Sequence, residues 1–401
     1  MLAYPKNIIF DYKTYKLYNK FMNKLPNGWE EKRLDDLFKE FTEKNHADKN
    51  ILASTQDRGV IPSDLLDRHI IRKKESLSNY KLVKKGCFVI SLRSFQGGFE
   101  YSNYEGIISP AYTILEPKMK LVDDFYKYYF KSYYFINKSL PKYAEGIRDG
   151  KQIKYKACKE ILVPYPPLDE QKRIASALSK IDAYLENTIK LIEEKERFKR
   201  GIAKKLLTCK EGENIPEARF KGFEDEWEIK TLNSISNIKK GEQKNKLDLI
   251  ADGKYPVLNG GMNFSGYCNS YNREANTITI SEGGNAGYVN FIKEKFWSSG
   301  HCYTLHDLKI DKYFLYQCLK NSEKRLMKLQ LGTALKNIRQ SEIVEFELNI
   351  PKSIKEQEKI GGYLSLLDEE IDNLKKQKEL IKEMKRGAMQ KLLSGEVRLL
   401  E

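Results

Sequence analysis

The sequence predicts an α+β protein with two mixed α/β domains and two long coiled-coil helices, produced by an internal duplication. The segment around Gln171 returns around Gln357, a displacement of 357 − 171 = 186 positions, and the register holds without a gap as far as Leu207 and Leu393. In both segments apolar residues recur at alternating steps of four and three positions, and between the segments lie short β-branched and aromatic runs broken by glycine. A repeat this long indicates duplication of a whole domain with its connector, because solenoid repeats have periods of about 20–50 residues.

The two repeated segments predict coiled-coil helices, because alternating steps of four and three are typical of a coiled-coil seam. Prolines at positions 166, 167 and 351 precede the segments and mark where the helices begin, since proline fits ahead of a helix and not inside one. Nearly forty residues with a rise of about 1.5 Å each give each helix a length of roughly 55 Å. The predicted seam residues are Ile174, Leu178, Ile181, Leu185 and Ile192 in the first helix and Ile360, Leu364, Leu367, Ile371 and Leu374 in the second.

The domains between the helices match each other more weakly. Residues 29–34 and 227–232 both begin with tryptophan, and a predicted strand at 88–91, followed by Gly97, matches one at 278–281, followed by Gly287. Residues 125–137 and 312–331 predict helices. The predicted organisation is a first domain at 1–165, a first helical segment at 166–212, a second domain at 213–350 and a second helical segment at 351–401.

Composition restricts the class of protein. The chain has 401 residues and a formal net charge of +15, which suits a polyanionic partner, although a lysine-rich genome would explain the same charge. Six cysteines without a C-x-x-C pair argue against a zinc ribbon and a disulfide scaffold. The N-terminal segment lacks the apolar core of a signal peptide, and no apolar run reaches the length of about 18 residues that a membrane span needs. We therefore expect a soluble cytoplasmic protein that does not contact a membrane.

Catalytic motifs are missing from the sequence. The Pro166–Pro167 pair lacks the flanking residues with which amino-methyltransferases hold a flipped base, and it is better explained as the stop before a helix. Neither a dinucleotide-binding glycine motif nor a P-loop is present. His301, Cys302 and His306 lie close together but are too few at suitable spacing for a metal site. We therefore expect no catalytic residues, no metal and no cofactor in this chain.

The duplicated organisation resembles the specificity (S) subunit of type I restriction-modification systems. Residues 215–227, IPEARFKGFEDEW, are similar to that family's lead-in to its second target recognition domain, and the Glu-Gln runs at 170–174 and 356–360 are similar to the start of its two spacer helices. The first copy departs from the pattern, because LPNGW at 25–29 stands in place of the lead-in that contains Arg-Phe. The resemblance covers almost the whole chain.

The resemblance implies that the two domains are target recognition domains, joined by antiparallel spacer helices with pseudo-two-fold symmetry. Each domain would read one half of a bipartite site in double-stranded DNA, and helix length would set the gap between the halves. Two modification (M) subunits would bind along the helices and methylate adenine with S-adenosylmethionine. Restriction (R) subunits would join the complex and use ATP and Mg²⁺. All of these cofactors would belong to the partner subunits.

Base readout needs polar side chains on loops held by a rigid scaffold. The candidates in the first domain lie in three loops and are Thr55, Gln56, Arg58, Arg93, Ser94, Gln96, Arg148, Lys151, Gln152 and Lys154. The candidates in the second domain are Asn259, Asn263, Asn285, His301, Lys336, Asn337 and Arg339. For any single residue, an exposed loop position without base contact is the simpler interpretation, and some lysines and arginines would contact phosphate alone. The prediction therefore applies to the loops as groups.

Two other functions compete with this one. The chain could be a nuclease or methyltransferase with divergent motifs, and binding of S-adenosylmethionine by the isolated chain would support this alternative. It could instead be a coiled-coil protein that bridges DNA without sequence preference, in which case binding would fall with salt and ignore sequence. Duplication with diverged interiors disfavours both functions, because a non-specific bridge gains nothing from two different ends.

Overall fold

The computed structural model describes residues 25–66, 74–144, 153–332 and 336–399. The chain forms two compact units, each of which combines one domain with a part of each long helix. Unit 1 comprises residues 1–187 and 378–401, and unit 2 comprises residues 188–377. Both long helices therefore pass from one unit into the other.

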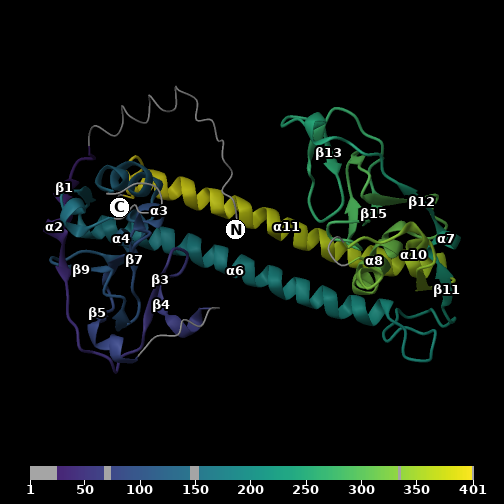
Figure 1. Cartoon of the computed structure of the whole chain (residues 1–401), viewed down its shortest axis with the longest axis horizontal. Helices are drawn as coiled ribbons and strands as arrows, with labels where there is room; N and C mark the ends of the chain where they lie inside the picture. The colour runs from purple at the N-terminus through teal and green to yellow at the C-terminus, as the bar shows by residue number, and fades with distance from the viewer. Residues whose placement is uncertain (1–24, 67–73, 145–152, 333–335, 400–401) are drawn as a thin grey trace. The chain divides into compact units, whose positions relative to one another are not determined.

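The two long helices are α6 (Leu168–Leu207) and α11 (Ile354–Leu393), each 40 residues long (Figure 1). At a rise of 1.5 Å per residue this corresponds to about 60 Å. Each helix begins within three residues of a proline, Pro167 for α6 and Pro351 for α11. The structure thus confirms the two predicted helices.

Unit 1 is built on a four-stranded sheet with the order β2-β9-β6-β7 and antiparallel pairing throughout. These strands are β2 (Phe38–Phe41), β9 (Thr113–Pro117), β6 (Phe88–Ile90) and β7 (Glu100–Tyr101). Three strand pairs surround the sheet: β1 (Glu30–Arg33) with β10 (Leu162–Tyr165), β3 (Leu52–Thr55) with β4 (Gly59–Pro62), and β5 (Lys81–Val83) with β8 (Gly106–Ile108). The short α-helices are α2 (Leu34–Leu37), α3 (Ser94–Gly97), α4 (Asp123–Tyr129) and α5 (Tyr155–Cys158).

Unit 2 repeats the plan of unit 1. Its four-stranded sheet has the order β12-β18-β15-β16, formed by β12 (Asn237–Lys240), β18 (Cys302–His306), β15 (Thr277–Ser281) and β16 (Val289–Ile292). The pair β11 (Glu228–Thr231) with β19 (Glu347–Ile350) corresponds to β1 with β10. A second sheet, β14-β13-β17, contains β13 (Tyr255–Leu258), β14 (Gly266–Cys268) and β17 (Trp297–Ser298). The α-helices are α7 (Leu232–Ile235), α8 (Lys312–Asn321), α9 (Glu323–Met327) and α10 (Gln340–Val344).

The predicted strands at 88–91 and 278–281 are confirmed as β6 and β15, but each predicted domain helix is interrupted. The helix expected at 125–137 consists of α4 and a π-helix (Phe135–Ser139), and the Ser132 hydroxyl accepts a hydrogen bond from the Phe135 amide between them. The helix expected at 312–331 is divided at Ser322 into α8 and α9. The breaks escape a periodicity argument because buried apolar residues lie on both sides of each.

The sequence match paired Gly287 with Gly97, but the residue that corresponds to Gly287 in the structure is Gly98. Gly98 and Gly287 both have positive φ values, 75° and 87°, and each lies two residues before its strand, β7 or β16. A Cβ atom on Gly98 would lie 1.9 Å from the Phe130 carbonyl oxygen, and one on Gly287 would lie 2.9 Å from the Met327 amide nitrogen. Both positions therefore need glycine because the sheet meets helical backbone there.

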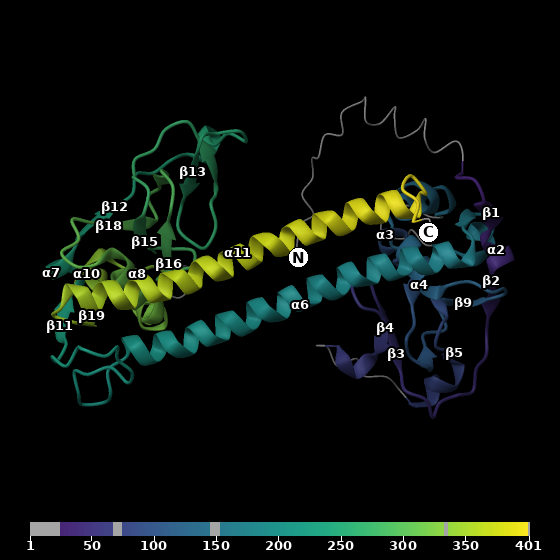
Figure 2. The same ribbon diagram turned by 180° about the vertical axis from the view of Figure 1, so that it is seen from behind.

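In both units the ends of the long helices pack into the hydrophobic core of the domain. In unit 1, Ile174 and Leu178 of α6 share one hydrophobic core with Leu392 and Leu393 of α11 and with the aromatic residues of the domain. In unit 2, Leu206 and Leu207 of α6 share a core with Ile360 and Leu364 of α11. Within each unit the beginning of one helix thus lies beside the end of the other, which makes the segments antiparallel (Figure 2). The outer seam residues pack against a domain as well as against the partner helix.

All ten predicted seam residues are buried or half-buried. The two helices also carry a repeated ion pair, because Asp182 contacts Lys385 at 2.5 Å in unit 1 and Asp368 contacts Lys199 at 2.5 Å in unit 2. Both the aspartates and the lysines are 186 positions apart, from 368 − 182 and 385 − 199. The internal repeat is therefore a repeat of contacts and not only of sequence.

Candidate nucleic-acid interface

A glutamine at the start of each long helix attaches the domain to the helix. The Gln171 side chain accepts a hydrogen bond from the Val122 amide at 2.9 Å and donates one to the Pro166 carbonyl at 2.7 Å. Gln357 repeats both bonds, to the Asp311 amide at 2.9 Å and the Pro351 carbonyl at 2.8 Å. Both glutamines are almost fully buried. Each therefore orients the first turn of a domain helix, α4 or α8, relative to the spacer.

The preceding glutamate of each helix holds an arginine and a tryptophan. In unit 2, Glu356 accepts hydrogen bonds from Arg219 at 2.7 and 2.8 Å and from the Trp227 indole at 3.4 Å. In unit 1, Glu170 accepts hydrogen bonds from Arg398 at 2.5 and 2.7 Å and from the Trp29 indole at 2.9 Å. The arginine missing from the lead-in of the first copy is thus supplied by the C-terminal tail.

In unit 1 two of the three predicted loops meet. Lys131 donates hydrogen bonds to the Gln56 carbonyl at 3.2 Å and the Gly97 carbonyl at 2.8 Å, and it also pairs with Glu100. A Cβ atom on Gly97 would lie 2.8 Å from the Gln56 side chain. The turn at 55–59 and the loop at 93–97 therefore form one surface, anchored from below by a lysine that the sequence argument did not identify.

The candidates on this surface divide into exposed and supporting residues. Gln56, Arg58, Arg93 and Gln96 are exposed. Thr55, which is half-buried, donates to the Gly59 carbonyl at 2.9 Å and accepts from the Arg58 amide at 3.1 Å. Ser94 is 1% exposed, and its hydroxyl accepts from the Ser91 amide at 2.8 Å. We therefore correct the prediction for Thr55 and Ser94, which stabilise the turns and have little surface left for a base.

The third predicted loop of unit 1 falls largely outside the described residues. Arg148, Lys151 and Gln152 lie in the undescribed range 145–152, so their placement stays a prediction. Lys154 is exposed at the start of α5.

Glu100 lies beneath the surface of the first two loops. Burial raises the pKa of Glu100 to about 7, although Lys131 opposes that shift. Its second carboxylate oxygen has no hydrogen-bond partner among the described residues. The loops of unit 1 thus rest on a carboxyl group that titrates near neutral pH.

In unit 2 the predicted loops converge on a cluster of glycines. A Cβ atom on Gly283 would lie 2.5 Å from the Asn337 side-chain oxygen and 3.9 Å from His301 Nδ1. A Cβ atom on Gly261 would lie 3.5 Å from the Asn285 side-chain oxygen. Four separate stretches of chain therefore meet at one surface.

This surface of unit 2 is polar and basic. Asn263, Asn285, His301, Lys336, Asn337 and Arg339 are exposed. Lys336 and Arg339 take part in no ion pair within the ranges that the structure describes, which leaves both free for phosphate or base contacts. The Asn259 side-chain oxygen is buried and unpaired among the described residues, so it does not face outward for base readout.

Glu282 connects several residues of the unit 2 surface and was not among the predicted site residues. It accepts hydrogen bonds from Lys240 at 2.6 Å and the Tyr303 hydroxyl at 2.8 Å, and it lies 3.4 Å from His301 Nδ1. Burial disfavours its charge, but the bonds from Lys240 and Tyr303 outweigh burial and lower the pKa of Glu282. Its hydrogen-bond partners Lys240 and Tyr303 are 42 and 21 residues away along the chain, and no local pattern marks such a contact.

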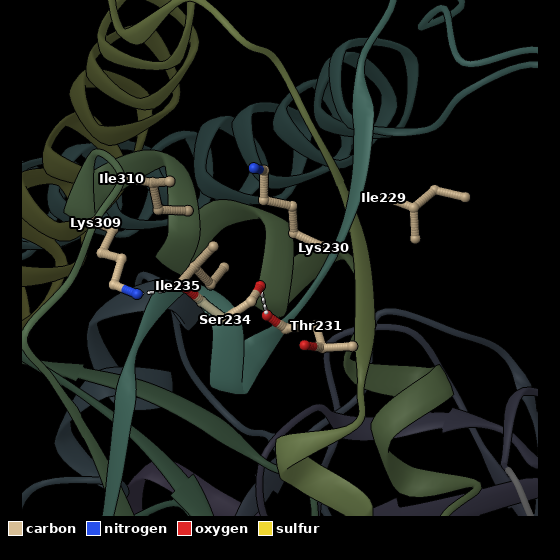
Figure 3. Close-up of a pocket in the computed structure, with 7 residues that line it drawn as sticks. All are labelled: Ile229, Lys230, Thr231, Ser234, Ile235, Lys309 and Ile310. Carbon is tan, nitrogen blue, oxygen red and sulfur yellow. Dashed lines mark hydrogen bonds between the residues drawn. The ribbon is translucent and has the colours of Figure 1, made fainter.

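A separate shallow pocket in unit 2 does not contain the predicted base readers. Figure 3 shows its seven lining residues, Ile229, Lys230, Thr231, Ser234, Ile235, Lys309 and Ile310, which enclose about 430 Å³. Within the pocket Lys309 donates to the Ser234 carbonyl at 3.0 Å, and the Ser234 hydroxyl donates to the Thr231 carbonyl at 2.7 Å. The loop surfaces, and not this pocket, collect the candidate residues.

Two further properties concern the described residues alone. No three histidine, cysteine, aspartate or glutamate side chains in them are grouped so that they could hold a metal ion. No helix in this part of the chain is both long enough and apolar enough to cross a membrane.

Comparisons with known proteins agree with the repeated architecture. The family model described as the type I restriction modification DNA specificity domain matches residues 26–194 and again residues 224–383. A crystal structure of the type I restriction-modification S subunit from M. genitalium superimposes with a TM-score of 0.61 at 20% identity, covering 92% of this chain and 98% of that one. At this identity the likeness concerns the fold.

Two curated relatives differ in how much they share with this chain. The specificity subunit of the type I restriction enzyme MjaVIII from Methanocaldococcus jannaschii is 26% identical over 408 residues, 94% of each chain. A Mycoplasma pneumoniae protein named as a type I specificity subunit is 40% identical over 151 residues, 37% of this chain. The match spans only 40% of the length of the M. pneumoniae relative.

Proposed function

Because the chain belongs to the type I restriction modification DNA specificity family, we propose that it is the sequence-specific DNA-binding subunit of a type I restriction-modification complex. Each domain is a target recognition domain that reads one half of a bipartite site in double-stranded DNA. The chain itself is not an enzyme. The family model describes DNA specificity, and the relatives are named specificity subunits.

The observation that carries this proposal is the contrast between the repeated junctions and the different loops. Gln171 and Gln357 make the same two hydrogen bonds, so each domain is attached to its helix in the same way. The loop surfaces share no such pattern, because one rests on Lys131 and the other on a glycine cluster around Gly283. A common attachment with two different loop surfaces is what the reading of two different half-sites requires.

The spacer helices offer equivalent positions for two M subunits. Phe198 on α6 is 53% exposed, and Met384 on α11 is 50% exposed. The two residues are 384 − 198 = 186 positions apart, so they are related by the internal repeat. Exposed apolar side chains at positions related by the repeat would present the same kind of contact to two copies of one partner.

The partners provide the chemistry in this proposal. The M subunits bind S-adenosylmethionine and methylate adenine, and the R subunits use ATP and Mg²⁺ for translocation and cleavage. The contribution of this chain is to bind and orient DNA, with Arg93 and Arg339 as candidates for base or phosphate contacts.

DNA selection tests the recognition role. The chain would be purified with the M subunit of the same system, and duplexes would be selected from a random pool at about 150 mM salt. We expect two short blocks of fixed bases with a spacer of constant length. A pool without sequence preference, bound in a manner that depends on salt alone, would overturn the proposal in favour of a DNA-bridging protein.

Subunit stoichiometry tests the docking role. Phe198→Asp and Met384→Asp should each release one of two M subunits, because each places a charge in one of two equivalent contacts. Leu247→Asp is the matched control, since Leu247 is 95% exposed in a domain and not on a spacer helix. Native mass spectrometry that found two M subunits bound to both helix variants would refute this docking surface.

A further inference from the structure

The loop between β13 and β14 presents two exposed apolar side chains at the candidate interface of unit 2. Met262 is 54% exposed and Phe264 is 39% exposed, and Asn263, a candidate base reader, lies between them. Neither apolar residue belongs to the hydrophobic cores of unit 2. Their side chains are therefore not needed to fill the interior of the domain.

The base of this loop is held firmly. The Gly261 amide donates to the Ser281 hydroxyl at 2.8 Å, and the Asn290 side chain donates to the Gly261 carbonyl at 3.2 Å. The Ser265 amide donates to the Val257 carbonyl at 2.8 Å on the other side of the tip. The exposed pair is thus carried on an anchored loop, so ordering it on binding costs little entropy.

Close packing sets the direction of the chain before the tip. Gly260 has a φ of +75°, and a Cβ atom there would lie 2.7 Å from the Gly283 carbonyl oxygen and 2.9 Å from the His301 carbonyl oxygen. Only glycine fits this approach. The tip consequently lies next to the loops that carry Asn285 and His301.

The charge around the tip favours a nucleic acid as its partner. Lys336 and Arg339 are exposed and form no ion pair within the described ranges, and His301 and Asn337 lie at the same glycine cluster. An apolar pair surrounded by cationic and amide side chains suits a DNA duplex. The cations and amides would contact the phosphates, and the apolar side chains would contact the stacked bases. A protein partner would need acidic side chains opposite these cations, whereas every duplex supplies phosphates.

We propose that Met262 and Phe264 form an apolar wedge that inserts at one base step of the half-site bound by unit 2 and unstacks it. Methionine and phenylalanine are among the side chains that proteins use for this purpose. The inference rests on the proposed function and adds a second source of specificity, because a flexible pyrimidine–purine step is deformed at lower cost than other steps. The β3–β4 turn of unit 1 carries the polar residues Gln56, Asp57 and Arg58 at its tip, so this wedge belongs to unit 2 and we expect it to act at one half-site.

The test uses the complete complex and the duplex found by DNA selection, with 2-aminopurine placed at successive positions through both half-sites. We expect fluorescence to rise at one step of one half-site. Phe264→Ala and Met262→Ala should remove the rise and weaken binding by on the order of tenfold, since stacking on a base is lost. Phe264→Leu should keep the rise, because leucine also acts as a wedge. Leu247→Ala is the control for an exposed apolar residue elsewhere in the domain, with no effect expected.

The outcomes separate the wedge from the proposed function. If the wild-type complex selects a bipartite site but no position brightens, or if Phe264→Ala keeps both fluorescence and affinity, the wedge is wrong and the recognition role stands. Loss of the M subunit from the Phe264→Ala complex would show that the tip docks protein and would also overturn the wedge. A wild-type complex without sequence preference would overturn both.

Discussion

The C-terminal tail closes unit 1 through one buried ion pair, and Arg398→Ala should therefore destabilise that unit. Arg398 donates to Glu170 at 2.5 and 2.7 Å and to the Asn27 carbonyl at 3.0 Å. The Glu170 side chain is 2% exposed and that of Arg398 is 22% exposed. Removing one partner of a buried pair costs about 3–5 kcal/mol. We expect the lower end, about 3 kcal/mol, because water reaches the arginine side of the pair.

Hydrogen exchange followed by mass spectrometry measures this loss locally, which matters because the chain has two units and global unfolding need not be two-state. In Arg398→Ala, peptides covering residues 26–33 and 168–175 should exchange about a hundredfold faster. Glu170→Gln combined with Arg398→Ala should recover part of the protection, since no buried charge remains. Arg219→Ala is the matched variant and should act on unit 2 alone.

Protonation of Glu170 at low pH should break its ion pair with Arg398. Burial opposes the charge of Glu170, but the hydrogen bonds from Arg398 and Trp29 outweigh it, so the pKa of Glu170 lies below its usual value. A depressed carboxylate pKa contributes stability that is present above the unfolded-state pKa and is lost as pH falls through the folded-state pKa. Unchanged exchange in Arg398→Ala at neutral pH would refute the view that this pair closes the unit.

Three further predictions follow from the junctions and loops. Gln171→Ala should cost unit 1 about 2 kcal/mol, from two hydrogen bonds of about 1 kcal/mol each, and Gln357→Ala should cost unit 2 the same; equal exchange of both units in either variant would contradict this. The pKa of Glu100 is raised to about 7 in the folded protein, so folded unit 1 binds this proton more tightly than the unfolded chain does. The resulting contribution to the free energy of unfolding is fully present below the usual glutamate pKa of 4.5 and is lost as pH rises through about 7. Glu100→Gln should therefore flatten the dependence of the stability of unit 1 on pH between about 4.5 and 7, measured by hydrogen exchange of unit 1 peptides in the two proteins, and parallel curves would count against it. Arg93→Ala and Arg339→Ala should each weaken discrimination at a different half-site, by about 1–3 kcal/mol if the residue contacts a base, and competition binding that showed uniform weakening across sequences would assign them to phosphate.

The long helices could be predicted because steps of four and three are a local pattern, and the duplication because the same pattern returns 186 positions later. Steps of four and three between Ile174 and Ile192 identify a buried stripe whatever surrounds it. The breaks after Tyr129 and at Ser322 could not be predicted, since apolar residues continue on both sides. The role of Arg398 was also hidden, because its partner Glu170 is 228 residues away.

The candidate interface could be predicted as loops and not as individual residues. Polar residues beside glycine indicated the loops around Gly97 and Gly283, and the structure brings neighbouring loops together there. Composition cannot distinguish a side chain that faces outward from one that bonds its own turn, which is why Ser94 was misassigned. The apolar tip at Met262 and Phe264 could not be predicted, because exposed apolar residues in a loop look the same in sequence as apolar residues that pack into the core.

The most direct test of the central claim, that the two units read two halves of one DNA site, is a genome-wide map of adenine methylation. The chain would be co-expressed with the M subunit of the same system in a host without other adenine methylation. We predict a bipartite motif with a fixed gap that disappears when this chain is omitted and that becomes degenerate in one half only in Arg339→Ala. Methylation from a stable complex at a single undivided motif, or at no defined sequence, would contradict the claim.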